Sequence, residues 1–343
     1  MSEVVAFDSA WAGLPTYLRA ALAPLRVWLA DARVVEISVN RPGEVFVEIL
    51  GAPAMERHDV PDLTSDAIRR MAQQVASETK QAVNEETPLL SAALPHGERF
   101  QAVLSPAAPS GGAISIRKQV VKNLTLAEFE KAGGLELVNV SAGERLTETD
   151  RRLIELLDSK AIGDFLRLAI KERISMVISG GTSTGKTTFL NALLKEVPLD
   201  ERIVSIEDTR ELQPPHPNYV PLIASKGDQG MSRVTIQDLL EASLRMRPDR
   251  LFLGEVRGAE AFSFLQAINT GHPGSMTTVH ANSPLQAYDR LALMSMQAGL
   301  GLSKAEIVDY IRSVIPIVVQ LSRHGGQRAP SEIQFVKYGA GRG

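Results

Sequence analysis

A run of small, flexible and polar residues, GGTSTGKTT at 180–188, directly follows the apolar stretch ISMVIS. Gly180, Gly185, Lys186 and Thr187 match the phosphate-binding pattern G-x-x-x-x-G-K-[ST] at every defined position. Glycines let successive backbone N–H groups point into one concavity, and the N-terminus of the following helix adds about half a positive charge. The sequence therefore predicts a site for the phosphates of a nucleotide.

Each side chain of this loop has an expected role toward ATP and Mg²⁺. Lys186 should reach the β- and γ-phosphates, and the Thr187 hydroxyl should bind the metal. The remaining contacts to the nucleotide are expected from Gly180, Gly181, Thr182, Ser183, Thr184, Gly185 and Thr188.

Three carboxylates, Glu207, Asp208 and Glu211, stand where the next apolar run, RIVSIE, ends. Acids at the point where a parallel strand ends lie in the ligand crevice of such a sheet. Glu207 could orient or deprotonate the attacking water, and Glu211 is a second candidate. Asp208, between them, could equally close a turn.

The stretch RPDRLFLGEVRG resembles a Walker-B strand, in which four mostly apolar residues precede an acid. The usual metal-binding residue there is aspartate, but here Gly254 precedes a single acid, Glu255. We expect Glu255 either to meet Mg²⁺ through a water or to polarise the nucleophile. Arg250 and Arg257 flank this acid, as surface residues or as subunit contacts.

Two histidines bracket a fourth apolar run in GHPGSMTTVHAN. Their spacing does not suit a metal on one helix face, and the chain has no cysteine to help. His280 stands at the C-terminal end of the run, where it could sense the γ-phosphate. His272 is assigned to the nucleotide site, with a role in a turn as the alternative.

From residue 151 onward the patterns of strands and helices alternate, as a parallel α/β sheet requires. Such a sheet would position these groups. The expected strands are 174–179, 202–207, 250–255 and 275–281, with a closing hairpin in the C-terminal tail. The prediction for 151–343 is an α/β domain with a parallel-rich sheet and a phosphate loop, which resembles a RecA-like P-loop ATPase domain.

The first part of the chain has a different pattern. Residues 33–39 and 44–50 predict strands joined by the turn NRPG, and strands at 98–104 and 113–118 follow around the turn PHGE. Between these pairs, 63–83 predicts a helix with an apolar stripe, capped by Thr64 or Ser65. We expect a smaller α+β domain with an antiparallel sheet over 1–125, and a linker over 126–150.

Alternation in this N-terminal sheet singles out two arginines. Arg99 faces away from the apolar side of GERFQAVL, and Arg117 faces away from that of AISIRK. If the apolar faces share a core, both guanidiniums emerge together, which favours an anion between them, and a triphosphate is already indicated. We expect Arg99 and Arg117 to be catalytic, with Lys118 able to share the role.

Composition limits the function classes. The chain has 343 residues, 44% hydrophobic and 22% charged, with a net charge of −3 and no cysteine. The length fits about two globular domains. The small net charge gives no strong field toward nucleic acid, and the absence of cysteine excludes disulfides and thiolate metal sites. No apolar run is long enough for a membrane span, and the N-terminus lacks a signal-peptide pattern, so we expect a cytoplasmic protein.

Four segments together carry a family resemblance: GGTSTGKTT, SIEDTRELQ, RPDRLFLGEVRG and TGHPGSMTTVHANS. Their order and spacing resemble the Walker A, Asp box, Walker B and His box of the secretion "traffic" ATPases. The last two segments, with SVNRPGEVFVE and LPHGERFQAVLSPA in the N-terminal part, look closest to the hexameric ATPase of VirB-type type IV secretion systems. The resemblance covers nearly the whole chain.

This resemblance implies a homohexamer at the cytoplasmic face of the bacterial inner membrane, with nucleotide between the two domains and N-terminal arginines at its phosphates. ATP hydrolysis would drive substrate export or pilus biogenesis. Expected partners are inner-membrane secretion-channel and coupling proteins, and a protein or nucleoprotein cargo. The alternatives are a type IV pilus or type II secretion ATPase, a RecA-like DNA translocase, and a scaffold that binds ATP without turnover.

Overall fold

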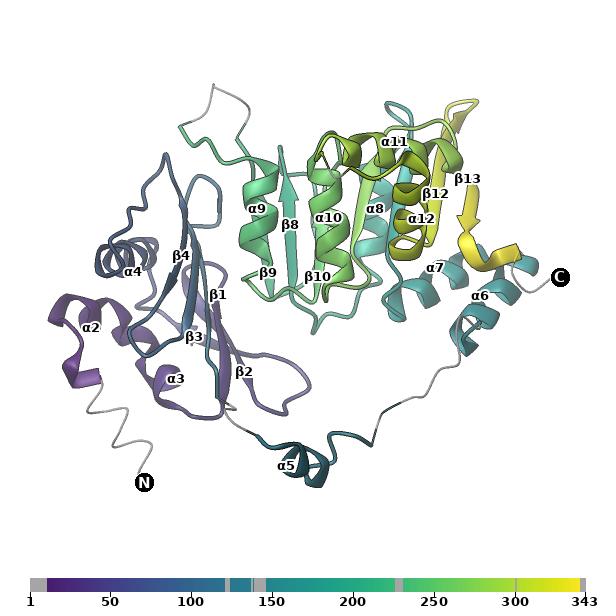
Figure 1. Ribbon diagram of the computed structural model, residues 1–343. Coiled ribbons are helices and arrows are strands. Elements are labelled where there is room, and N and C mark those ends of the chain that lie inside the picture. The colour runs from purple at the N-terminus through teal and green to yellow at the C-terminus, as the bar shows by residue number, and fades with distance from the viewer. Residues whose placement is uncertain are drawn as a thin grey trace.

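The computed structural model describes residues 11–120, 124–136, 138, 146–225, 231–299 and 301–339. It contains two sheets that lie in separate parts of the chain (Figure 1). The first sheet is built from residues before 120, and the second from residues after 175.

The N-terminal sheet is antiparallel and has the strand order β3-β2-β1-β6-β5-β4. Its strands are β1 (Val34–Val39), β2 (Gly43–Ile49), β3 (Glu56–Val60), β4 (Leu89–Ala93), β5 (Arg99–Val103) and β6 (Ala113–Arg117). The helices α2 (Thr16–Leu22), η1 (Ala23–Leu25), α3 (Arg26–Ala30) and α4 (Ser65–Glu78) accompany it.

Helix α4 has the apolar stripe that its sequence predicts. The Thr64 hydroxyl accepts the Ala67 N–H at 3.1 Å and so caps the first turn. Ile68, Met71 and Val75 are buried in the N-terminal core. The predicted α+β domain with an antiparallel sheet is therefore confirmed.

The second sheet has seven strands in the order β13-β12-β7-β11-β10-β8-β9. Their bounds are β7 (Met176–Gly180), β8 (Ile203–Glu207), β9 (Tyr219–Ile223), β10 (Arg250–Leu253), β11 (Met276–Val279), β12 (Ile317–His324) and β13 (Gln327–Phe335). Neighbouring strands pair in parallel except β12 and β13, which form the antiparallel closing hairpin.

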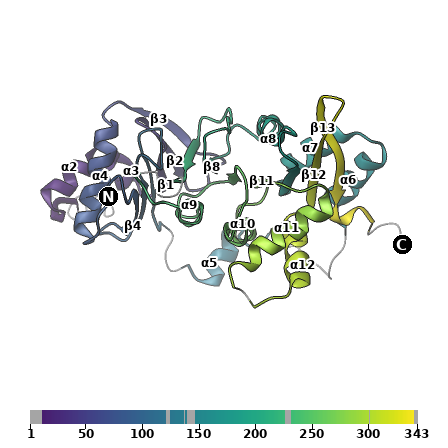
Figure 2. The same ribbon diagram turned by 90° about the horizontal axis from the view of Figure 1, so that it is seen from above.

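Helices cover both faces of this sheet, as its continuously apolar strands require (Figures 1 and 2). Val177 faces one core, whereas Met176 and Ile178 face the other. One face packs α9 (Ile236–Ser243), α10 (Glu260–Asn269), α11 (Pro284–Met296) and α12 (Lys304–Val314); the other packs α6 (Glu148–Asp158), α7 (Ile162–Lys171) and α8 (Lys186–Leu194). The short 3-10 helix η3 (Val336–Gly339) ends the described chain.

The structure adds elements that the sequence patterns did not indicate. The turn PHGE joins β4 to β5, and not β5 to β6 as expected. The edge strands β3 and β9 are not among the predicted strands, because neither shows a clear alternation of polar and apolar residues. The segment predicted as a linker contains α5 (Leu126–Lys131), whose cap Thr125 forms a capping box with Glu128. Helix α6 begins at Glu148, shortly before the predicted domain boundary.

A buried arginine joins the two domains within the chain. Arg202 is fully buried, and its Nη1 donates to Asn40 Oδ1 and Asn218 Oδ1, both at 2.6 Å. Its Nε donates to the Met246 carbonyl at 2.9 Å. Because its polar contacts come from both domains, they fix the N-terminal sheet against the β8–β9 edge.

Arg250 is a second buried arginine, and its placement corrects an expectation. It was predicted to lie on the surface or in a subunit contact, but it is fully buried and makes a bidentate ion pair with Glu201 at 2.6 and 2.9 Å. The alternation of β10 turns this side chain inward, so Arg250 has a structural role.

Among the described residues, no helix is both long and apolar enough to cross a membrane.

Candidate active site

The carboxyl ends of four neighbouring parallel strands meet at one pocket of about 310 Å³. The loop after β7 carries the phosphate-binding motif, and β8, β10 and β11 end near Glu207, Glu255 and His280. The pocket is lined by Ser183, Thr184, Gly185, Lys186, Thr187, Thr188, Glu207, Asp208, Thr209, Glu211, Gly254, Glu255, Arg257, Thr278, His280 and Arg328. Most of the predicted site residues are thus brought together.

The loop itself needs its glycines for two different reasons. Gly185 caps α8 with a left-handed φ of 89°, a conformation that a side chain disfavours. Gly180 is needed for space, because an added Cβ would lie 2.5 Å from Thr184 Oγ1 and 2.9 Å from the Leu321 carbonyl. Ser183 also has a positive φ, 61°. The backbone therefore forms the concave turn that suits an anion.

Lys186 begins α8 and points back into this turn. Its ammonium donates to the carbonyls of Gly180 and Gly181, both at 3.0 Å, and lies 3.4 Å from His280 Nδ1. Burial lowers the pKa of Lys186, and the nearby charge of Glu255 opposes that shift. A cation with so little water around it interacts strongly with a phosphate.

Glu207 is buried at the end of β8 and is held on one side only. Its Oε1 accepts the backbone N–H groups of Glu211 and Leu212 at 2.8 and 2.9 Å. Within the described part of the chain, Oε2 is buried and has no hydrogen-bond partner. Burial raises the pKa of Glu207, while the two N–H donors oppose the shift. This combination favours Glu207 over Glu211, which is exposed, as a base or water-orienting group.

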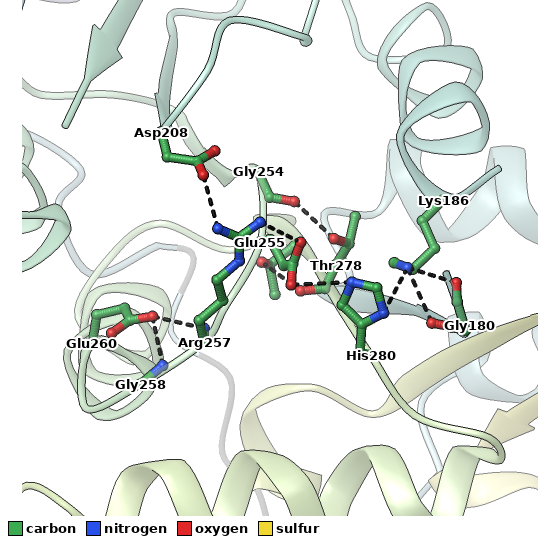
Figure 3. A network of polar contacts seen from close by, with 12 residues as sticks. Gly180, Lys186, Asp208, Gly254, Glu255, Arg257, Gly258, Glu260, Thr278 and His280 are labelled. Atoms are coloured by element: carbon green, nitrogen blue, oxygen red, sulfur yellow. Dashed lines mark hydrogen bonds and ion pairs between the residues drawn. The ribbon is translucent and has the colours of Figure 1, made fainter. Parts of the chain in front are cut away.

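Glu255 and His280 contact each other beside the lysine (Figure 3). His280 Nε2 lies 3.2 Å from Glu255 Oε1. Since the Lys186 ammonium can only donate, His280 Nδ1 accepts from it, and the imidazole proton belongs on Nε2, facing Glu255. The Thr278 hydroxyl donates to the Gly254 carbonyl at 2.8 Å and fastens β11 to the end of β10.

Three predicted site residues lie away from the phosphate loop. His272 precedes β11 and therefore stands at the strand end opposite to His280; its Nδ1 lies 2.8 Å from the Pro248 carbonyl. The structure does not bring it to the phosphate loop. Arg99 and Arg117 are direct partners across β5 and β6, as alternation predicted. They line pockets beside Arg247, and among the described residues none from the N-terminal domain lines the phosphate-loop pocket.

Sequence reasoning missed two cations of the pocket. Arg328, on β13, lies against the phosphate loop, since its Cβ and Cδ are 3.6 Å from a Cβ placed on Gly185. Arg257 bridges Asp208 and Glu255 (Figure 3). The only signal for Arg257 was its position two residues after the acid, and Arg328 requires the strand order β13-β12-β7.

Comparison with known proteins identifies the family. Residues 19–338 match the family described as Type II/IV secretion system protein. The type IV secretion system protein VirB11 of Bartonella quintana is 37% identical over 327 residues, which cover 92% of this chain and 91% of the relative. The chain belongs to the VirB11 family. Protein VirB11 of Agrobacterium fabrum is 34% identical over 313 residues, 90% of each chain.

A solved VirB11 structure shares the fold. The crystal structure of the VirB11 ATPase from the Brucella suis type IV secretion system, in complex with sulphate, matches with a TM-score of 0.88 and 36% identity. The match covers 96% of this chain and 97% of the other. It confirms the RecA-like domain preceded by an α+β domain, and the VirB11 relatives favour type IV secretion over the pilus and type II alternatives.

Proposed function

We propose that this VirB11-family chain hydrolyses ATP with Mg²⁺ and uses the energy to power substrate export or pilus biogenesis in a type IV secretion system. The observation that carries the chemistry is the convergence of Lys186, Glu207 and Glu255 on one pocket. The family supports the biological role.

The donor set suits a hard divalent cation. Thr187, Glu207 and Glu255 offer oxygen atoms in the same pocket, and the buried Glu207 Oε2 has no partner among the described residues. Mg²⁺ in phosphoryl-transfer sites takes few protein ligands and fills its shell with water and phosphate oxygens, so the few acids present suffice. We assign Thr187 and Glu255 as its ligands, Glu255 through a water. The bound ion would neutralise charge on the transferring phosphoryl group.

The protein groups then have separate tasks. Lys186 binds the β- and γ-phosphates in the backbone concavity. Glu207, with its raised pKa and free oxygen, orients or deprotonates the attacking water. His280 touches both Lys186 and Glu255, so it can report on the γ-phosphate.

Lys186 gives the direct test. Lys186→Ala and Lys186→Gln should abolish phosphate release, because each removes the cation from the phosphates. Lys195→Ala is the matched control, since Lys195 is exposed at the other end of α8. All three should unfold at the wild-type temperature. Turnover near wild type in either Lys186 variant would refute the phosphate-loop assignment.

The assembly is a separate proposal that rests on the family resemblance. We propose a homohexamer at the cytoplasmic face of the inner membrane, attached through secretion-channel and coupling proteins and serving a protein or nucleoprotein cargo. A ring is the closed form of a repeated heterologous interface. Light scattering with Mg²⁺ and a non-hydrolysable ATP analogue should give six times the 37.2 kDa chain mass. A monomer at all concentrations would contradict the ring.

A further inference from the structure

Arg257 joins two carboxylates that belong to different strands of the sheet (Figure 3). Its Nη1 donates to Asp208 Oδ2 at 2.8 Å, and its Nη2 donates to Glu255 Oε2 at 3.0 Å. Asp208 follows β8, and Glu255 follows β10. One guanidinium therefore connects the ends of these neighbouring strands.

The backbone of Arg257 is anchored independently of its side chain. The N–H groups of Arg257 and Gly258 both donate to Glu260 Oε1, at 2.7 and 2.8 Å. Glu260 begins α10, so the loop between strand and helix is fixed to that helix. An anchored backbone restricts where the guanidinium can lie, which reduces the entropy lost when it pairs.

Stability alone does not account for this arrangement. The Arg257 side chain is 58% exposed and that of Asp208 is 41% exposed, and pairs in such settings typically contribute less than about 1 kcal/mol to folding. The Glu255 side chain, by contrast, is only 20% exposed. The contacts of Arg257 therefore matter more for the orientation of Glu255 than for the free energy of folding.

Glu255 is held on both of its oxygens. Arg257 contacts Oε2, and His280 lies 3.2 Å from Oε1, so rotation of the carboxylate would break one contact or the other. Two further charged groups of the same pocket are Lys186, which contacts His280, and Glu207, whose side chain packs against Gly254. A group that acts on a nucleophile must keep a defined direction, and small misplacements cost large factors in rate.

We propose that Arg257 is a positioning residue for hydrolysis: it fixes the orientation of Glu255 and uses Asp208 as its second anchor. This inference rests on the proposed ATPase function. Arg257 acts through Glu255 and leaves the phosphate contacts of Lys186 intact. Its loss should therefore lower kcat and leave nucleotide affinity nearly unchanged.

The test compares Arg257→Ala, Arg257→Lys, Asp208→Asn and the double variant Arg257→Ala/Asp208→Asn in the full chain. We measure kcat and KM by phosphate release, the Kd of a fluorescent ATP analogue, and the unfolding temperature. Arg257→Ala should lower kcat roughly 10- to 100-fold with less than about a threefold change in Kd. Arg257→Lys should restore part of kcat, because an ammonium can meet one carboxylate but lacks the planar fork that meets two.

The double variant separates positioning from a local structural effect. Asp208→Asn alone should lower kcat less than Arg257→Ala, and the double variant should be no slower than Arg257→Ala, because Asp208 acts through the arginine. Arg210→Ala, an exposed arginine on the same loop as Asp208, is the matched control and should resemble wild type.

Each remaining outcome has a defined meaning. A kcat within twofold of wild type for Arg257→Ala, a loss confined to KM, or additive effects in the double variant would overturn the positioning role. Failure of the proposed function looks different: wild-type protein would show no Lys186-dependent turnover, whatever the state of Arg257.

Discussion

Gly254 lies directly against the side chain of Glu207. A Cβ built on Gly254 would be 3.1 Å from Glu207 Cγ and 3.7 Å from Oε1. A side chain at the position before the Walker-B acid would therefore crowd the buried carboxylate of the neighbouring strand. Gly254, which departs from the usual Walker-B pattern at the end of β10, leaves room for Glu207 at the end of the neighbouring strand β8.

Gly254→Ala should slow hydrolysis at least roughly 10-fold, because the added methyl displaces a carboxylate that acts through its exact direction. The ATP affinity should change little, since the phosphate loop is untouched. Steady-state kinetics with a binding measurement will separate the two quantities. Gly163→Ala, on α7, where the nearest atom to an added Cβ is the tip of Arg167, provides the control. Unchanged kcat in Gly254→Ala would mean that Glu207 can shift without consequence.

The two acids of the pocket, Glu207 and Glu255, should behave as a pair in catalysis. Glu207→Gln and Glu255→Gln keep the shape of each side chain and remove its charge, so both variants should bind ATP and hydrolyse it slowly. Glu211→Gln should lose less activity, because Glu211 supports Glu207 through its backbone N–H and not through its carboxylate. Single-turnover phosphate release measures the chemical step. If both variants keep more than about a tenth of the wild-type rate, a loss under about 1.4 kcal/mol, neither acid carries the chemistry.

Glu36 should make the folding stability depend on pH. It is 1% exposed, and within the described chain neither carboxylate oxygen has a hydrogen-bond partner. Burial raises its pKa from 4.5 to about 7, although Arg202, Arg247 and Arg117 lie near and oppose the shift; Glu48 adds to it.

The direction of this pH dependence follows from the number of protons that the folded and unfolded chains bind. Between about pH 4.5 and 7 the folded chain holds a proton that the unfolded chain has released, so the free energy of unfolding falls as the pH rises through this window. The full cost, present above pH 7, is on the order of 3 kcal/mol. Glu36→Gln should therefore be more stable than wild type at pH 8 and gain much less at pH 4.5.

Urea unfolding at the two pH values measures this difference. Glu56→Gln, an exposed glutamate on β3, should leave the pH dependence as it is in wild type. A stability difference between Glu36→Gln and wild type that is the same at both pH values would show that the Glu36 carboxylate titrates normally.

Much of the fold and the pocket could be predicted because the signals are local. The phosphate loop needs a strand, glycines at fixed positions and a helix, all within a few residues. Glu207, Glu255 and His280 each follow an apolar run, and parallel strands place their carboxyl ends at one edge. Alternation likewise predicts that Arg99 and Arg117 lie on the same face of the N-terminal sheet, where they pair across β5 and β6.

The remaining features depend on which strands are neighbours, and no local pattern carries that information. Arg328 reaches the phosphate loop only because β12 pairs with β7 and β13 pairs with β12. Glu201, the ion-pair partner of the buried Arg250, lies 49 residues away in the sequence. His272 precedes β11 and His280 follows it, so the rule that places His280 at the pocket places His272 at the opposite end of the strand.

Arg99 and Arg117 lead to the last prediction, which concerns two chains. They face each other across β5 and β6, but the phosphate-loop pocket of their own chain is lined by residues from the other domain. The interdomain contacts of Arg202 hold the N-terminal sheet at the β8–β9 edge, on the opposite edge of the sheet from the β12–β13 hairpin. We therefore predict that, in the proposed hexamer, these arginines complete the pocket of an adjacent subunit.

Mixed rings test this directly. Lys186→Ala lacks the phosphate-binding cation, and Arg99→Ala/Arg117→Ala lacks the arginine pair, so each protein alone should be nearly inactive. In rings assembled from equal amounts of both, an intact phosphate loop will meet an intact arginine pair at about a quarter of the interfaces, since each interface joins two independently chosen chains. Phosphate release should recover to that order, and only after the subunits have exchanged. If the arginines served their own chain, every chain in the mixture would lack one essential group, and mixing would restore nothing.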